Sequence, residues 1–167
     1  MIDIRHETLK ALRATPVVVR ALVAGLTAEE ARHRPEPAEW AVVEVVAHMA
    51  DTDERALARV RRMLDERDPA LSSFDQDALA VERRYLDMDV ADQAERYAAG
   101  RADHVSQLES LDDDGWHRTG HHEEHGSVTV ELYEVHVANE DVGHLAQIAR
   151  NLSAMREAPI GSQGRTS

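Results

Sequence analysis

Residues 40–67 read WAVVEVVAHMADTDERALARVRRMLDER. Along this stretch apolar side chains return every three or four residues, which is the spacing of one face of an α-helix. The apolar positions are Val42, Val45, Val46, Met49, Leu57, Val60, Met63 and Leu64. Prolines stand on both sides, within residues 34–37 and at Pro69, and proline cannot continue a helix. The stretch therefore predicts a long amphipathic helix from about Trp40 to Arg67.

Three other stretches show the same period and also predict helices. They run from about Ile4 to Leu26, from Val90 to Leu111 and from Val128 to Met155. Pro16 interrupts the first, so we expect either a kink or a helix in two pieces. Thr27 and Glu30 have the spacing of a capping box that opens a short turn. Residues 71–77 are predicted to be a loop that leads into a minor helix.

Four long helices with modest connections predict an all-α four-helix bundle. A chain of 167 residues suits one hydrophobic core, and the low aromatic content of 4% favours helices over sheets. We place this single domain at residues 1–155. Residues 156–167 contain one proline and two glycines and are expected to form a disordered tail.

The charge and composition restrict the partners of the protein. A formal net charge of −13 argues against nucleic acid, because nucleic-acid binding depends on clustered Lys and Arg. No stretch reaches the roughly 18 apolar residues of a membrane span, and the N-terminus does not resemble a signal peptide. We therefore expect a cytoplasmic protein without a membrane partner. The absence of cysteine leaves histidine and carboxylate side chains as metal ligands.

A polar segment from Asp112 to Ser127 precedes the last helix and is predicted to be a loop. It is longer than helix packing requires, and such loops are often functional. Its stretch His121-His122-Glu123-Glu124-His125 lacks the spacing of a zinc protease motif, so we interpret it as exposed. We expect the part from Trp116 to Gly126 to approach the mouth of a pocket lined by apolar residues of the first and third helices.

The last helix has three potential metal ligands on nearly one face. His136, Glu140 and His144 follow one another at intervals of four residues, or steps of about 6 Å. Apolar residues continue this face and predict that the column points into the bundle, where an unpartnered polar group is costly. His48 lies beside the apolar stripe of its own helix and can add a ligand across the core.

His48, Glu140 and His144 therefore form a candidate metal site. Three protein ligands with open positions for water are typical of a catalytic centre. Glu44 and Asp51 lie one turn to either side of His48 and are candidate partners for it. In the alternative interpretation, these histidines are core residues that form hydrogen bonds with carboxylates.

Two segments of the sequence resemble the DinB/YfiT-like superfamily. Trp40 is followed by EVVAHMAD at residues 44–51, and GSVT at residues 126–129 leads to EDVGHLAQI at residues 140–148. The resemblance extends over nearly the whole chain in order and length. It implies an up-up-down-down four-helix bundle, often dimeric, with a divalent metal ion bound by one histidine of the second helix and two of the fourth.

His48 and His144 match two of the family's ligands, and Glu140 occupies the position of the remaining histidine. Because glutamate is itself a competent ligand, the resemblance implies a site that still binds zinc or nickel. The added negative charge also allows harder ions such as manganese or iron. His136 is a reserve ligand one turn away.

Family members of known activity use the metal ion to activate a thiol or water, as in hydrolases and in transferases of low-molecular-weight thiols. The resemblance thus implies a metal-dependent enzyme that acts on a small molecule. The alternative is a non-catalytic bundle with a degenerate metal site and a stress or interaction role. The resemblance, together with the apolar run of residues 16–19, also predicts a homodimer.

Overall fold

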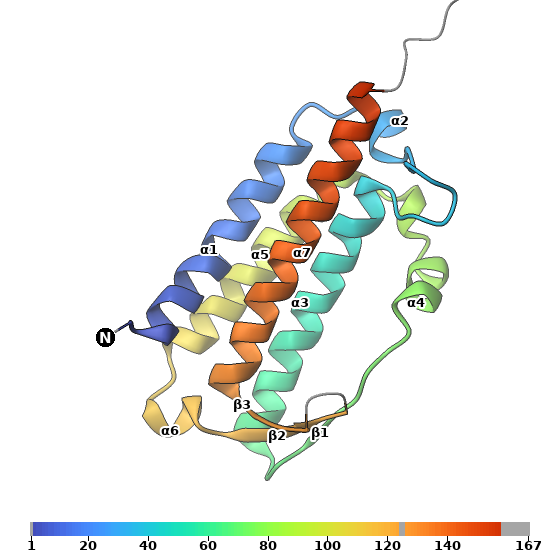
Figure 1. Ribbon diagram of the computed structural model, residues 1–167. Coiled ribbons are helices and arrows are strands. Elements are labelled where there is room, and N and C mark those ends of the chain that lie inside the picture. The colour runs from blue at the N-terminus through green and yellow to red at the C-terminus, as the bar shows by residue number, and fades with distance from the viewer. Residues whose placement is uncertain (1, 124–125, 158–167) are drawn as a thin grey trace, which may run out of the picture.

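The computed structural model describes residues 2–123 and 126–157. Four long helices within these residues form a bundle (Figure 1). They are α1 (Ile4–Val23), α3 (Val42–Asp65), α5 (Val90–Glu109) and α7 (Val130–Glu157). The predicted four-helix bundle is confirmed, and each helix lies within a few residues of its expected position. A small sheet, which composition did not predict, accompanies the helices.

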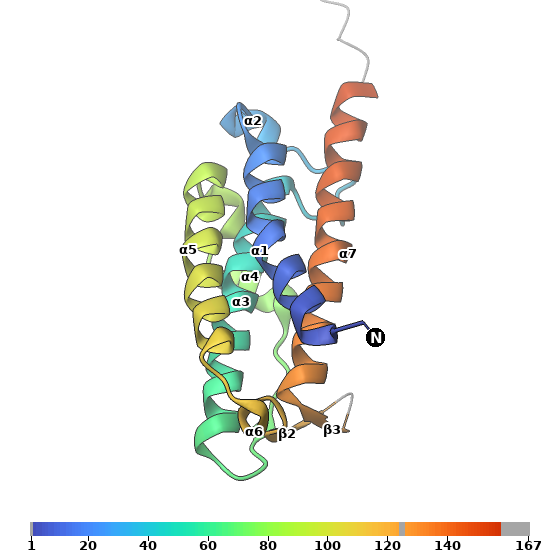
Figure 2. The same cartoon turned by 90° about the vertical axis from the view of Figure 1, so that its left-hand side faces the viewer.

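The four helices run in two directions. In Figures 1 and 2, α1 and α7 run upward, whereas α3 and α5 run downward. α1 and α3 each pack against both α5 and α7. The adjacent helices α1 and α7 are therefore parallel to each other, and so are the adjacent helices α3 and α5. The up-up-down-down topology is not confirmed, because the directions in chain order are up, down, down, up.

α1 is continuous through Pro16, so of the two alternatives expected there the helix in two pieces is excluded. Leu12 and Val19, one turn to either side, are fully buried. Their packing stabilises the helix at the position where proline cannot form the usual backbone hydrogen bond. Downstream, the predicted capping box is present at the start of α2 (Ala28–Ala31), where the side chains of Thr27 and Glu30 each accept a backbone N–H from the other residue.

α3 is the central element of the bundle. Every residue from Ala41 to Asp51 is buried, on all faces of the helix. α5 and α7 cover two sides, and the connection that contains α4 (Gln76–Glu82) and the 3-10 helix η1 (Tyr85–Asp87) covers another. Polar side chains in this part of α3 therefore lie in the interior, and each requires a partner there.

The segment of residues 112–127 is not simply a loop, which corrects the sequence prediction. It contains α6 (Asp113–Trp116), β2 (Thr119–His122) and β3 (Gly126–Thr129). β2 pairs in parallel with β1 (Ala70–Leu71) and antiparallel with β3. Because β1 lies about fifty residues earlier in the chain, the local pattern did not indicate this pairing.

α7 extends to Glu157, so the first two residues of the expected tail are helical. Residues 158–167, the rest of that predicted tail, lie outside the described residues. Within the described part of the chain, no helix has the length and apolar character needed to cross a membrane.

Candidate metal centre

His48 and His144 lie in contact across the α3–α7 interface. Their ring centroids are 4.9 Å apart, and the rings meet edge to face at 72°. Two imidazoles that share one tetrahedral zinc ion have centroids about 5 Å apart, because each ligating nitrogen lies about 2.0–2.1 Å from the metal. The separation of the two rings therefore fits a shared metal ion.

The surroundings of His48 keep its imidazole neutral. The ring is enclosed by Trp40, with centroids 5.0 Å apart, and by Phe74, at 6.4 Å. Burial, together with the neighbouring His144, lowers the pKa of His48 to about 4. Neutral imidazole is the form that binds a metal ion.

The nitrogen atoms of His48 are poorly satisfied by the protein. Nε2 lies 3.4 Å from Oγ1 of Thr52. Nδ1 is buried and has no hydrogen-bond partner among residues 2–123 and 126–157. A buried nitrogen without a partner is costly in a folded protein. The donor set at this position therefore fits a metal ligand.

Glu140 lies one turn before His144 and lines the same small cavity, of about 50 Å³. Its side chain is exposed, and His136 and His144 are half-buried, so the predicted column points only partly into the bundle. The next residue, Asp141, is buried instead. In the described part of the chain, no group of three or more His, Asp or Glu side chains is arranged to hold a metal ion. Ligation by Glu140 stays a prediction.

The cavity beside Glu140 is bounded by elements other than those expected. Its wall comes from α3, α7 and Arg101 of α5, and not from apolar residues of the first and third long helices. From the segment of residues 116–126, His122 of β2 approaches His136 in the cavity wall, with ring centroids 6.3 Å apart. His122 is buried, so the prediction that the whole histidine-rich stretch is exposed is wrong at this residue.

Glu44 and Asp51, the expected partners of His48, bind arginines instead. Glu44 accepts a hydrogen bond of 2.9 Å from Arg34 and also caps the first turn of α3. Asp51 forms ion pairs of 2.8 Å with Arg83 and 2.6 Å with Arg96. Both carboxylates thus join α3 to its neighbours.

A buried network centred on Arg101 was missed by the sequence analysis. Arg101 is only 2% exposed. It donates to Asp53 at 2.6 Å and to Asp141 at 2.6 Å, and Tyr97 donates to Asp141 at 3.1 Å. The network therefore connects α5 to both α3 and α7. Tyr97, Arg101 and His104 share the helical spacing of one face of α5, and this was the available signal.

His104 extends this network to Glu134. Its Nδ1 lies 2.9 Å from Asp53, and its Nε2 lies 3.2 Å from Glu134. Burial lowers the pKa of His104, but the carboxylates of Glu134 and Asp53 outweigh this effect and raise it to about 9. His104 is therefore protonated at neutral pH and donates to both acids.

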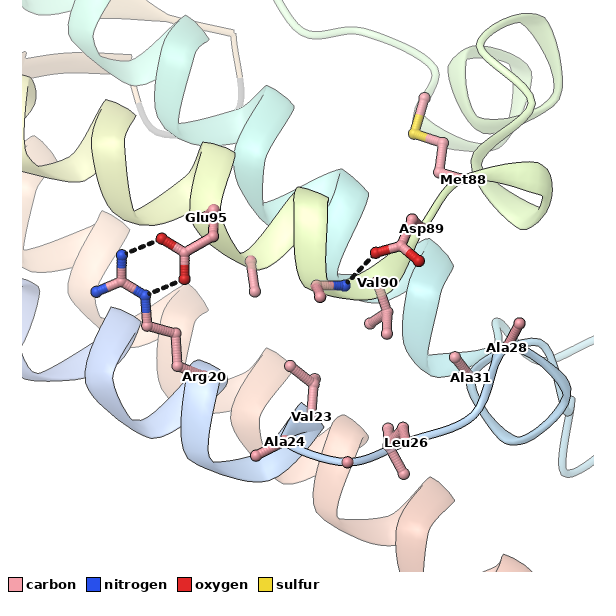
Figure 3. Close-up of a pocket in the computed structure, with 13 residues that line it drawn as sticks. Arg20, Val23, Ala24, Leu26, Ala28, Ala31, Met88, Asp89, Val90 and Glu95 are labelled. Atoms are coloured by element: carbon pink, nitrogen blue, oxygen red, sulfur yellow. Dashed lines mark hydrogen bonds and ion pairs between the residues drawn. The ribbon is translucent and has the colours of Figure 1, made fainter.

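The protein has further pockets besides this cavity. Figure 3 shows one of about 210 Å³ where α1 ends and α5 begins, with Val23, Leu26 and Val90 in its wall and an ion pair between Arg20 and Glu95. It contains none of the predicted ligands. Another is an open pocket of about 270 Å³ on the outer side of His144. Its lining residues are Ala38, Glu39, Trp40, Gln76, Asp77, His144, Gln147 and Arg150.

Comparisons with known proteins identify related sequences and folds. The sequence model of the DinB superfamily matches residues 11–148. A Geobacillus thermodenitrificans (strain NG80-2) protein named "Putative metal-dependent hydrolase" is 36% identical over 70 residues, or 42% of this chain and 39% of that protein. This chain thus aligns with less than half of that relative.

Among solved structures, YfiT from Bacillus subtilis has the same fold. It is described as "a probable metal-dependent hydrolase with an unusual four-helix bundle topology". The TM-score is 0.82 at 20% sequence identity, and the match covers 91% of this chain and 87% of YfiT. At this identity, the likeness supports the fold alone.

Proposed function

This chain belongs to the DinB superfamily, and from this premise we propose that it is a metal-dependent hydrolase whose divalent ion is bound by His48, Glu140 and His144. The observation that carries the proposal is the contact between the His48 and His144 rings, in which a buried nitrogen of His48 has no hydrogen-bond partner among the residues that the structure describes. The name of the Geobacillus protein supports a metal-dependent reaction in general.

The residues of this chain have separate roles in the proposed site. A divalent ion with open positions would lower the pKa of bound water and polarise an electrophile. Trp40 and Phe74 hold the ring of His48 and exclude water from it. Glu140 brings a negative charge, which favours cation binding and admits harder ions such as Mn²⁺ or Fe²⁺ beside Zn²⁺ and Ni²⁺.

The open pocket beside His144 supports a small-molecule substrate. Its volume of about 270 Å³ suits a small metabolite. Arg150 offers a positive charge, Asp77 a negative charge and Gln76 a neutral amide for polar contacts. A low-molecular-weight thiol would fit the same opening, so thiol transfer is the second reaction of interest at this site. We also propose a homodimer, because Val17 is 65% exposed on α1 and Val18 beside it is 40% exposed.

Metal titration of designed variants tests the proposed ligands. Metal-stripped protein is titrated calorimetrically with ZnCl₂ and NiCl₂. His144→Ala should lose the tightest site, and Glu140→Ala should weaken it by roughly 100-fold or more, because even outer partners of metal ligands are worth 10–100-fold. Glu140→His should keep or raise the affinity, because imidazole is a better ligand for both ions.

The exposed His33 offers a matched control, since His33→Ala removes an imidazole that does not line the cavity and should change nothing. Circular dichroism confirms the fold of each variant. Equal affinity in the wild type and Glu140→Ala would exclude Glu140 as a ligand. Unchanged binding by His144→Ala would favour the non-catalytic alternative. Ester, amide and thiol substrates are then assayed with the stripped and the reloaded protein.

A further inference from the structure

α7 presents a second histidine pair on the other side of Glu140. His144 lies one turn after Glu140 and contacts His48 of α3. His136 lies one turn before Glu140 and faces His122 of β2, with ring centroids 6.3 Å apart and an interplanar angle of 61°. Both histidines of α7 thus face a histidine from a different element, although the proposed hydrolase site uses only the first pair.

Regular backbone holds both members of the second pair. His122 is in the middle strand of the sheet, where it is paired with Leu71 of β1 and Gly126 of β3. Its side chain is only 6% exposed, and the alternation along β2 leaves His121 on the solvent side. His136 projects from the second turn of α7, which follows β3 directly. The two rings therefore approach each other from fixed elements.

The separation of the rings is within the range for a shared metal ion. With nitrogen–metal distances of about 2.0–2.1 Å, two ligating imidazoles have centroids between about 5 Å in tetrahedral and about 6.4 Å in linear geometry. The observed 6.3 Å lies within this range at its upper end, so tetrahedral ligation requires side-chain movement that brings the two ring centroids about 1 Å closer.

The charges beside the pair are balanced. His136 lines the cavity of about 50 Å³ together with Glu140 and Arg59. Arg59 forms hydrogen bonds with the hydroxyl of Tyr133 and the carbonyl of Ser72. The carboxylates of Asp53, Glu140 and Asp141 line the same cavity as the guanidinium groups of Arg59 and Arg101. The positive charges are therefore offset, and the cavity admits a cation.

We propose that His122 and His136 form a second metal site, separate from the one at His48 and His144. Two imidazole ligands favour a borderline transition-metal ion such as Zn²⁺, Ni²⁺ or Cu²⁺, and water completes the coordination. With two protein donors, this site binds more weakly than one with three. The inference goes beyond the proposed hydrolase and does not depend on it.

Equilibrium dialysis of the full-length, metal-stripped protein against NiCl₂ tests the second site. We expect two equivalents in the wild type. His136→Gln should lose the weaker one and keep the tighter one, whereas His144→Ala should do the reverse. His121→Gln is the matched control, because His121 is the exposed neighbour of His122 on the same strand. It should bind like the wild type.

A spectroscopic measurement locates the ion independently. Addition of ZnCl₂ to His144→Ala should shift the imidazole ¹⁵N resonances of His122 and His136 together. The half-buried His136 is the preferred position for substitution, since a change at the buried His122 can unfold the sheet. If His136→Gln binds as many nickel ions as the wild type, with the same affinities, the second site does not exist. If His144→Ala instead binds nickel with the same stoichiometry and affinities as the wild type, this would contradict the proposed hydrolase site.

Discussion

His104 is a fully buried, positively charged residue in the interior of the bundle. It lies between the carboxylates of Asp53 and Glu134, and Asp53 also accepts from Arg101. Buried charges of this kind cost desolvation free energy, and the loss of one partner leaves another charge uncompensated. Because Arg101 also holds Asp141, the residue after Glu140, the network restricts the rotation of α7 on which the candidate site depends.

The stability of the protein should fall at alkaline pH because of His104. Its pKa of about 9 in the folded state lies above the ordinary 6.5. The stabilisation is therefore fully present below about pH 6.5 and is lost as the pH rises through 9. It is on the order of 3 kcal/mol. Urea unfolding of metal-free protein between pH 6 and pH 10 measures this loss, and His104→Gln should flatten the dependence over that interval.

The exposed His33 provides the control for this experiment, since His33→Gln should keep the wild-type pH dependence. Parallel curves for the wild type and His104→Gln would show that His104 is not protonated in the fold.

Two glycines, Gly120 of the small sheet and Gly143 of α7, differ in how closely other atoms pack against them. A Cβ at Gly120 of β2 would lie 3.0 Å from both Leu71 of β1 and Met63 of α3, so the sheet is packed closely against the end of α3. A Cβ at Gly143 of α7 would meet no atom within 4 Å. The first glycine is needed for close approach, whereas the second only weakens its helix.

Alanine at these two positions should have opposite effects on the free energy of unfolding. Gly120→Ala should lower it by about 1–3 kcal/mol through overpacking. Gly143→Ala should raise it by about 0.5–1 kcal/mol through helix propensity, without a change in metal affinity. Urea denaturation compares both variants with the wild type. A neutral Gly120→Ala would mean that Leu71 and Met63 can move apart without cost.

On the scale of the whole molecule, α1 and α7 are neighbours that both retain exposed apolar side chains. Val17 of α1 is 65% exposed, and Leu132 and Val142 of α7 are 59% and 63% exposed. A monomer tolerates single exposed apolar residues, whereas a group of them on neighbouring elements is typical of an interface.

We predict a homodimer in solution whose interface includes Val17 and Val18. Light scattering at micromolar concentration should give twice the chain mass of 18.6 kDa. Val17→Glu should shift the protein towards the monomer, because a buried unpaired charge is unfavourable. Val81→Glu on α4, at a site that is 78% exposed, is the control and should leave the mass unchanged. A monomeric wild type would contradict the prediction.

The sequence by itself determined the helices and the approach of His48 to His144. The 3.6-residue period is local, so it predicted four long helices, and the Thr27–Glu30 cap is also formed by residues close in sequence. The stripe of residues 42–64 placed His48 towards the core, where the structure brings it to His144. Whether these residues bind a metal ion stays a prediction.

Only the tertiary structure decided the sheet, the Arg101 network and the orientation of Glu140. β1 pairs with β2 about fifty residues away, and Arg101 reaches Asp53 and Asp141 across two helix interfaces. The pairing of β1 with β2 leaves no local periodic signal, and the period of α5 places Arg101 on an inward face without indicating its partners on α3 and α7. Glu140 and Asp141 are adjacent, yet neighbours on a helix point about 100° apart, because a turn has about 3.6 residues. The rotation of α7 that buries Asp141 and exposes Glu140 therefore depends on what α3 and α5 present to it.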